Sequence, residues 1–133
     1  MKNEVSKIME PCVRILICGS RDWSNADVIR QRLNKIKCNV IVIHGGCRGA
    51  DKLAGEIAQS MGMKVEVYIP DWKSYGKAAG PLRNQRMLDE GKPTIVIAFH
   101  NDIINSKGTA DMVNRAKNLG MTVEIIKEDL QDL

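Results

Sequence analysis

The chain has 133 residues and a formal net charge of +4, and 44% of its residues are hydrophobic and 27% are charged. This is the size of one ordinary domain with an average globular composition, which excludes a disordered, collagen-like or coiled-coil chain. The small positive charge favours a small anionic ligand and argues against a duplex-DNA partner, which would require a basic stripe.

Composition divides the chain into three segments. Residues 1–12 are expected to form an N-terminal extension, residues 13–126 the folded domain and residues 127–133 an acidic tail. No apolar run approaches the roughly 18 residues of a membrane-spanning helix, and the N-terminus lacks the apolar stretch of a signal peptide. We therefore expect a cytoplasmic protein with no membrane partner.

Five short runs rich in Val and Ile predict strands. In chain order they are residues 13–18, 40–44, 65–69, 94–99 and 122–126. The first, second and fourth runs are almost continuously apolar, which is typical of central parallel strands that are covered on both faces. The third and fifth runs alternate between apolar and polar residues, as edge strands do.

Segments with helical periodicity separate these strands. The apolar spacing predicts helices over residues 25–36, 51–61 and 110–119, and Gly80 with Pro81 marks the start of another over 81–90. Residues 70–79 show no periodicity and are expected to form a loop that serves a ligand.

The alternation of strand and helix predicts an α/β fold. We expect a single Rossmann-like domain of three layers, in which a five-stranded, mostly parallel sheet lies between helices. Alternation alone leaves the strand order open, and the flavodoxin-like order is one of the alternatives.

The segments that follow the strands carry the candidate ligand site. In such a sheet, ligands bind beyond the carboxyl ends of the strands, where helix N-termini offer N–H groups and a partial positive charge. These segments are rich in glycine, which lets an anion approach the backbone, and in side-chain donors that suit phosphate. The candidate ligand-binding residues are Gly19, Ser20, Arg21, Asp22, Gly45, Gly46, Arg48, Gly49, Asp51, Trp72, Tyr75, Asn84, Lys107, Gly108 and Thr109.

Some of these residue types have two interpretations. Asp51 and Asp111 are either helix N-caps or partners of ribose hydroxyls. In a functional role they would contact ribose rather than phosphate, because a carboxylate there would compete with phosphate for the same amides. Trp72 and Tyr75 are either packing residues or a platform on which a base stacks.

The sequence argues against several familiar cofactor sites. The two histidines and the four cysteines have no metal-ligand spacing, so no metal is expected. There is no GxxxxGK[ST] motif, which excludes a P-loop nucleotidase. Residues 19–22 are not GxGxxG, and His44 rather than an acid ends the second strand, which argues against a classical NAD dehydrogenase. We expect no cofactor.

Taken together, these segments resemble one family. They are residues 19–23 (GSRDW), 44–51 (HGGCRGAD), 71–88 and 107–112 (KGTADM). They are similar to the YspA-like, YpsA-related branch of the SLOG superfamily, which also contains the DprA/Smf DNA-processing proteins and the LOG (Lonely Guy) phosphoribohydrolases. The similarity extends over residues 13–126. It implies a Rossmann-like fold that binds nucleotides or derivatives such as ADP-ribose and NAD, and the LOG relatives imply a homodimer as one option.

The resemblance to LOG enzymes also implies candidate catalytic residues. Those enzymes cleave the N-glycosidic bond of nucleoside 5′-monophosphates with an arginine in an RKxxM-like motif and the glutamate of PGGxGTxxE. Residues 83–87 (RNQRM) resemble the first motif and place Arg83 on the catalytic arginine. The second motif departs from the pattern, because Met112 stands in place of the glutamate and Asp111 is the nearest carboxylate.

Three functions follow, in order of preference. The first is binding of a nucleotide derivative, with its phosphate on the backbone amides of residues 45–49 and 108–109. The second is an N-glycoside hydrolase of the LOG type, with Arg83 and Asp111 as catalytic residues and Asp51 as the alternative carboxylate. It is less favoured because glycoside cleavage needs a carboxylate at the position of Met112, and a thioether cannot replace one. The third and weakest is DprA-like binding of single-stranded DNA, because the chain lacks an extended basic face.

Overall fold

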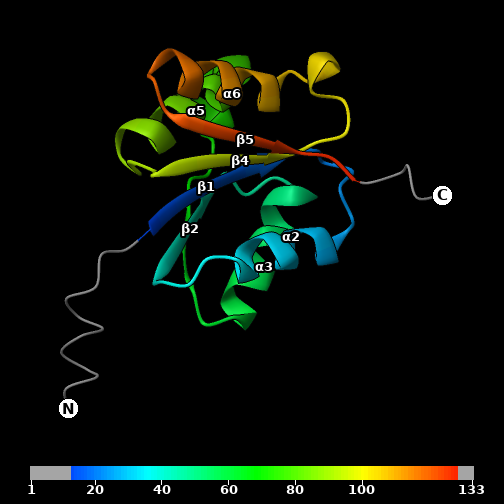
Figure 1. Ribbon diagram of the computed structural model, residues 1–133. Coiled ribbons are helices and arrows are strands. Elements are labelled where there is room, and N and C mark those ends of the chain that lie inside the picture. Colours follow the sequence, from blue (N-terminus) through cyan, green and yellow to red (C-terminus); the bar gives the residue numbers. More distant parts are fainter. Residues whose placement is uncertain (1–12, 129–133) are drawn as a thin grey trace.

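A parallel sheet forms the middle layer of the protein (Figure 1). The computed structural model describes residues 13–128, and within this range the sheet is five-stranded and all its strand pairs are parallel. The strands are β1 (Val13–Gly19), β2 (Val40–His44), β3 (Lys64–Val67), β4 (Ile95–Phe99) and β5 (Thr122–Ile126). The order β3-β2-β1-β4-β5 is that of the Rossmann fold, not the flavodoxin-like alternative. The predicted α/β class is confirmed, with a sheet that is wholly rather than mostly parallel.

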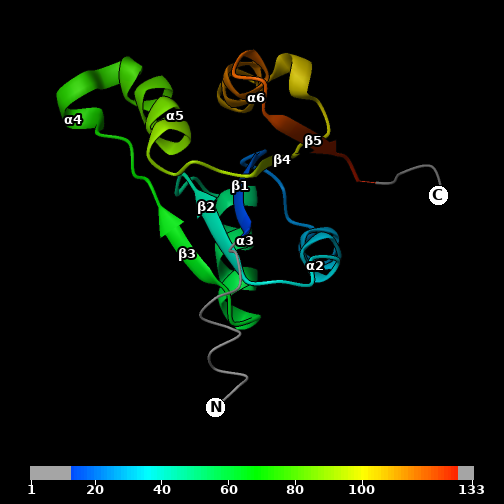
Figure 2. The same ribbon diagram turned by 60° about the vertical axis from the view of Figure 1, so that its left-hand side comes forward.

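Helices cover both faces of the sheet. α2 (Ala26–Asn34) and α3 (Ala50–Ser60) lie on one face, and α5 (Ala79–Asp89) and α6 (Gly108–Asn118) lie on the other (Figures 1 and 2). The side chain of Asn25 caps α2 by accepting a hydrogen bond from the backbone N–H of Val28 at 3.3 Å. The three predicted layers are therefore present.

The central strand β1 supplies both cores. Ile15 and Ile17 are fully buried on the side of α2 and α3, whereas Leu16 and Cys18 are buried on the side of α5 and α6. Successive side chains of a strand point to opposite faces, so a continuously apolar strand can serve two layers at once. The two alternating runs form the edge strands β3 and β5, as their pattern predicts.

The segment expected to be a loop, residues 70–79, is instead largely helical. It contains α4 (Trp72–Tyr75) and the 3-10 turn η1 (Gly76–Ala78), and α5 begins at Ala79. The carboxylate of Asp71 starts α4 by accepting from the N–H of Ser74 at 3.1 Å. Pro81 lies in the first turn of α5, where the proline costs no hydrogen bond because first-turn N–H groups have no partner inside the helix. Figure 2 shows α4 beyond the β3 edge of the sheet.

The ends of the chain are only partly described. The proposed extension, residues 1–12, lies outside the described residues, as do residues 129–133 of the acidic tail. At the start of that tail, the carboxylate of Glu128 accepts hydrogen bonds from the side chains of Asn25, at 3.3 Å, and Asn101, at 3.0 Å. No helix in the described range is long and apolar enough to cross a lipid bilayer.

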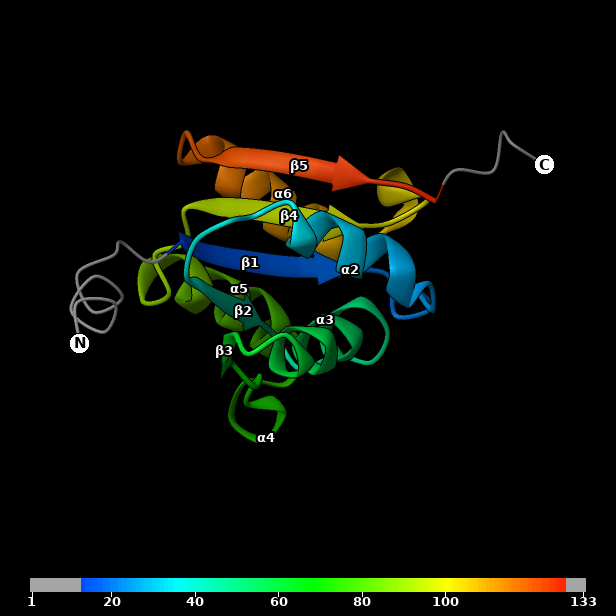
Figure 3. The ribbon, with the colours of Figure 1, turned by 60° about the horizontal axis from the view of Figure 1, so that its bottom comes forward.

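The sheet order fixes where a ligand site can lie. β1 and β4 are neighbours, and the chain leaves them for opposite halves of the sheet (Figure 3). Connections after such a pair of strands turn away from each other and leave a crevice beyond the carboxyl ends. Residues 20–23 and 100–107 therefore face each other across this crevice.

Candidate functional site

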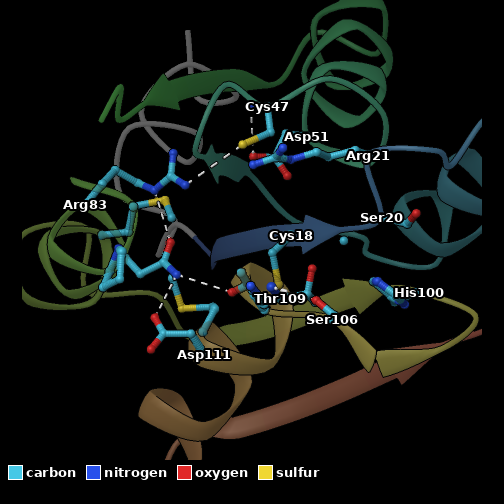
Figure 4. A pocket seen from close by; sticks show the side chains of 18 of the residues that line it. Cys18, Ser20, Arg21, Cys47, Asp51, Arg83, His100, Ser106, Thr109 and Asp111 are labelled. Atoms are coloured by element: carbon cyan, nitrogen blue, oxygen red, sulfur yellow. Dashed lines mark hydrogen bonds between the residues drawn. The ribbon is translucent and has the colours of Figure 1, made fainter. Parts of the chain in front are cut away.

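A cavity of about 660 Å³ occupies the crevice beyond the carboxyl ends of the strands. Its walls come from the end of β1, from the connections after β1, β2 and β4, from α5 and from the start of α6 (Figure 4). Segments far apart in the sequence thus meet along one edge of the sheet, as the glycine-rich connections predict.

The cavity gathers most of the residues predicted from the sequence. It is lined by Gly19, Ser20, Arg21, Asp22, Asp51, Trp72, Arg83, Asn84, Lys107, Gly108, Thr109 and Asp111. Three further predicted residues, Gly45, Gly46 and Arg48, line an adjoining hollow of about 410 Å³. The remaining two predicted residues, Gly49 and Tyr75, line neither space.

Gly49 supports the site by packing rather than by facing it. The turn at Gly49 has φ +82° and ψ −128°, a conformation essentially restricted to glycine, and a Cβ atom there would overlap the backbone of Ser20 and Arg21. The next residue, Ala50, donates its N–H to the carbonyl of Ser20 at 3.0 Å. The connections after β1 and β2 are therefore held against each other.

The amides of residues 45–47, which were expected to hold phosphate, are already paired. The N–H groups of Gly45 and Cys47 donate to Oδ2 of Asp51 at 3.0 and 3.3 Å, and the N–H of Gly46 donates to Nδ1 of His44 at 3.0 Å. Asp51 thus lies inside the first turn of α3, with Gly49 at the N-cap, and its carboxylate occupies the place of an anion.

Burial shifts the pKa values of both acceptors. Burial raises the pKa of Asp51 to about 6, although the hydrogen bond from the Cys47 N–H and the positive charge of Arg83 each lower that pKa. Burial and the nearby Arg83 lower the pKa of His44 to about 4. His44 is therefore neutral at pH 7, and its Nδ1 can accept from Gly46.

Arg83 is buried beneath the connection after β2. Its Nη1 donates to the carbonyls of Gly45 and of Tyr68, the latter at 3.3 Å, and its Nε donates to Oδ1 of Asn84 at 3.0 Å. A Cβ atom on Gly45 would overlap the guanidinium, so the glycine makes room for it. Within residues 13–128, no carboxylate lies within 4.0 Å of this guanidinium, although its charge acts on the carboxylate of Asp51 from a greater distance.

Asn84 links Arg83 to the start of α6. Its Nδ2 donates to the carbonyl of Gly108 at 3.3 Å and to Oδ2 of Asp111 at 3.0 Å. Asp111 also pairs with Arg115, whose Nε lies 2.8 Å from the same oxygen. The carboxylate of Asp111 is thus held on both sides, and Figure 4 shows it at the Arg83 end of the cavity.

The N-terminus of α6 has backbone N–H groups that are free to bind an anion. Oγ of Ser106 accepts from the N–H of Thr109 at 3.1 Å, whereas the N–H groups of Gly108 and Ala110 have no hydrogen-bond partner in the described part of the chain. The space where a Cβ of Gly108 would lie is open. Helix N-termini carry a partial positive charge and favour anions.

Several charged side chains lie at the rim. Arg21, Lys77 and Lys107 line the cavity, and none of them forms an ion pair with another described residue. Trp72 is half exposed and lines both the cavity and the adjoining hollow. The rim therefore combines unpaired cations with one exposed aromatic ring.

Sequence analysis missed part of the lining. The further residues are Cys18, Cys47, Lys77, Gly80, Pro81, Met87, His100, Asp102, Asn105, Ser106 and Met112. Lys77 lies in the segment that was expected to serve a ligand and could have been included for that reason. Met87 and Met112 stand in the two motifs that resemble those of LOG enzymes, and this placement was the signal that could have included them. Among the described residues, no group of three His, Cys, Asp or Glu side chains could hold a metal ion.

Comparison with known proteins finds similar sequences and folds. Residues 13–75 match the model of the YspA, cpYpsA-related SLOG family. The chain is 35% identical over 119 residues to Gene 61 protein of Mycobacterium phage D29, a match that covers 83% of this chain and 93% of that protein.

Comparison with solved structures finds one protein that is similar in fold and one weaker match. DNA processing protein A (DprA) from Streptococcus pneumoniae is similar in fold, with a TM-score of 0.72 and 19% sequence identity. That match covers 96% of this chain but 54% of the DprA chain, so the present chain spans about half the length of DprA. A predicted subunit of tRNA methyltransferase from Methanocaldococcus jannaschii matches with a TM-score of 0.42 and 18% identity, over 90% of this chain and 69% of that one, and carries no argument about the fold.

Proposed function

The chain belongs to the YspA, cpYpsA-related SLOG family, and from this premise we propose that it binds a nucleotide or nucleotide derivative in the cavity at the carboxyl edge of the sheet. The ligand is a nucleoside monophosphate or a molecule of the ADP-ribose or NAD type. Membership of the family indicates a function related to nucleotides or nucleic acids, and the chemistry of the cavity supports the narrower choice.

One observation carries this proposal. The N-terminus of α6 opens into the cavity with the N–H groups of Gly108 and Ala110 unpaired within the described residues, and Lys107 lies beside it. A phosphate would complete these hydrogen bonds and would be favoured by the partial positive charge of the helix end.

The expected binding mode follows from the positions of the remaining groups. The phosphate lies on α6 rather than on residues 45–47, because Asp51 and His44 already accept from those amides. Trp72 at the rim offers an exposed ring for stacking of the base. Ser20 and Asp22 line the cavity after β1 and are suited to form hydrogen bonds with the sugar. The Ser20 hydroxyl can donate or accept, and the Asp22 carboxylate accepts.

Calorimetric titration with AMP and with adenosine tests the proposal. AMP should bind at least about tenfold more tightly than adenosine, because the phosphate supplies charge-assisted hydrogen bonds that the nucleoside lacks. At 100 times its dissociation constant, AMP should stabilise the folded protein by about 2.7 kcal/mol in thermal unfolding. Equal affinity for AMP and adenosine, or no stabilisation by AMP, ADP-ribose or NAD, would refute the proposal.

Hydrolysis of the N-glycosidic bond is a second candidate function. Two carboxylates, Asp51 and Asp111, line the cavity together with Arg83, and the raised pKa of Asp51 suits proton transfer near neutral pH. Against it, Asp111 is held by Arg115 and Asn84, and Asp51 is held by two amides.

Chromatography of AMP incubated with the protein separates the two candidates. We expect no release of adenine. Sustained release that is lost in both Arg83→Lys and Asp111→Asn variants, while each variant still unfolds cooperatively, would establish the hydrolase instead.

A further inference from the structure

A second hollow of about 410 Å³ lies directly beside the cavity. It is lined by Gly45, Gly46, Arg48, Ile69 and Pro70, together with Arg21, Cys47 and Trp72, which also line the cavity. Because these last residues border both spaces, the hollow continues the cavity past Arg21 and Trp72 toward the β3 edge of the sheet.

We propose that this hollow is a second ligand subsite and that the ligand has two parts. One part is the nucleotide whose phosphate lies on α6. The other is a second sugar or ring, joined through a second phosphate, that lies in the hollow. This inference rests on the proposed function and adds the extent of the ligand to it.

The charges around the hollow suit a second phosphate. Arg21 forms no ion pair with any described residue. Arg48 approaches Asp22 at 3.7 Å, but the two side chains are 71% and 89% exposed, and ion pairs of this kind contribute little. Both guanidinium groups are therefore available to bind an anion, and a guanidinium can donate two parallel hydrogen bonds to one phosphate.

Three backbone amides that border the hollow are already paired. The N–H groups of Gly45, Gly46 and Cys47, which border the hollow, donate to Asp51 and His44. Recognition of an anion in the hollow therefore depends mainly on side chains, and Arg21 and Arg48 are the cations that line it.

The walls of the hollow suit a ring. Ile69 is 63% exposed and Trp72 is 53% exposed, and both border the hollow together with Pro70. Large apolar side chains that gather around a concave surface gain free energy when a ligand covers them. A flat ring or a sugar face placed between Ile69 and Trp72 would bury apolar surface next to the two guanidinium groups.

The two anion positions lie on opposite sides of the cavity. Figure 4 shows Arg21 and Cys47 on the side opposite Ser106 and Thr109, which mark the start of α6. A ligand that meets both must cross the cavity. A mononucleotide meets one of them, whereas two units joined by a pyrophosphate can meet both.

Titration calorimetry with AMP and ADP-ribose tests the inference. ADP-ribose should bind about tenfold or more tightly than AMP, since it alone reaches the second subsite. Arg48→Ala and Ile69→Ser should each lower this preference at least about fivefold, because both remove a contact to the second part only. Both residues are exposed, so the variants should fold normally.

Two matched variants serve as controls. Arg30→Ala removes an exposed arginine from α2, and Leu119→Ser removes an exposed apolar side chain after α6; neither residue lines the cavity or the hollow. Both should keep the preference for ADP-ribose.

Three results would overturn the inference. In the first, AMP and ADP-ribose bind equally and Gly108→Ala weakens both, which leaves the proposed function intact and removes the second subsite. In the second, Arg48→Ala and Ile69→Ser leave the preference unchanged. In the third, an oligo-dT of ten nucleotides binds more tightly than ADP-ribose and with strong salt dependence, so that the hollow follows a nucleic-acid strand. If no nucleotide binds at all, the proposed function fails together with the inference.

Discussion

The carboxylate of Asp51 occupies the position in which a bound phosphate would meet the N–H groups of Gly45 and Cys47. This side chain therefore makes two amides of the connection after β2 unavailable to an anion, whereas the N–H groups of Gly108 and Ala110 at the start of α6 are unpaired within the described residues. The carboxylate of Asp51 is buried, which favours its protonated form, whereas the nearby charge of Arg83 favours its ionised form. At the residue scale, the site depends on these few internal hydrogen bonds.

Gly108→Ala tests the anion position on α6. The added methyl group meets no protein atom within 4 Å, but it lies beside the N–H that the phosphate is proposed to use. We expect AMP affinity to fall about tenfold or more, which corresponds to about 1.4 kcal/mol. Stability should be unchanged or rise by about 0.5 kcal/mol, because alanine restricts the unfolded chain.

The control is Asn114→Ala, an exposed position on the same helix. Calorimetry and thermal unfolding of the two variants give both quantities. Unchanged AMP affinity in Gly108→Ala would show that the phosphate lies elsewhere.

Asp51→Asn tests the buried carboxylate through pH. Because folding raises the pKa of Asp51 from 3.8 to about 6, its protonation stabilises the folded protein; this contribution is complete below pH 3.8 and is lost as pH rises through 6. Folding lowers the pKa of His44 from 6.5 to about 4, so its contribution is present above pH 6.5 and is lost as pH falls through 4. In the natural chain, these two effects oppose each other between pH 4 and 6.

The asparagine variant removes one of the two opposing effects. Urea unfolding should show that, between pH 7 and pH 4, the variant loses about 2 kcal/mol more stability than the natural chain. Parallel loss of stability in both proteins would mean that Asp51 titrates at its ordinary pKa.

At the scale of the elements, the connections after β1 and β2 behave as one unit. Gly49 places its turn against the backbone of Ser20 and Arg21, and the carbonyl of Ser20 accepts from Ala50. The side chain of Arg83 adds a second connection, because it extends from α5 and donates hydrogen bonds to the carbonyls of Gly45 and Tyr68. Three separate elements thereby fix the floor of the cavity.

Gly49→Ala should break this arrangement. A Cβ atom would both strain the backbone at φ +82° and overlap the neighbouring connection, so we expect a loss of about 3 kcal/mol or more in the free energy of unfolding. Gly62→Ala is a matched control, because Gly62 has φ +80° and nothing within 4 Å of the added atom. It should lose only about 1 kcal/mol, from backbone strain alone. Similar losses in the two variants, measured by urea unfolding, would contradict the packing role of Gly49.

The elements also show how far the sequence alone can predict the structure. The continuously apolar strands and the amphipathic helices follow from periodicity, because burial on one or two faces dictates their patterns. The short helix α4 and the turn η1 were missed, since neither buries a residue, α4 depends on a local cap from Asp71, and η1 has no side-chain cap at all. No periodic pattern records a turn of this kind.

The site was predicted as a set of residues but not as a set of contacts. Fold topology brings the connections after β1, β2 and β4 to one edge, so most of the predicted residues meet there. The reach of the Asp51 side chain back to Gly45, and of Arg83 to the same residue, depends on side-chain conformations that a sequence pattern does not encode. For this reason the free amides turned out to lie on α6 rather than at residues 45–47.

At the scale of the whole molecule, two cores share one sheet. β1 places Ile17 in the core under α2 and α3, and Leu16 in the core under α5 and α6. Neither core can loosen without disturbing the strand that builds the other. The domain should therefore unfold as one cooperative unit.

Leu16→Ala tests this coupling. Removal of a fully buried leucine should cost about 3 kcal/mol. Trp23 lies in the opposite core, so its fluorescence in a Trp72→Phe background should report the same urea midpoint as far-UV circular dichroism. Two separate midpoints would show that the halves unfold independently.

The contact between Ser20 and the turn at Gly49 also governs which parts of the rim can change length. An insertion in residues 20–22 or 45–49 would move one connection off the other and expose polar backbone that is now satisfied. Residues 73–78 bury no side chain and pack against neither core, so added or deleted residues there should leave the scaffold in place, whereas Ile103 in the connection after β4 packs against the core under α5 and α6. Redesign of this domain for a larger or smaller ligand should therefore begin at residues 73–78.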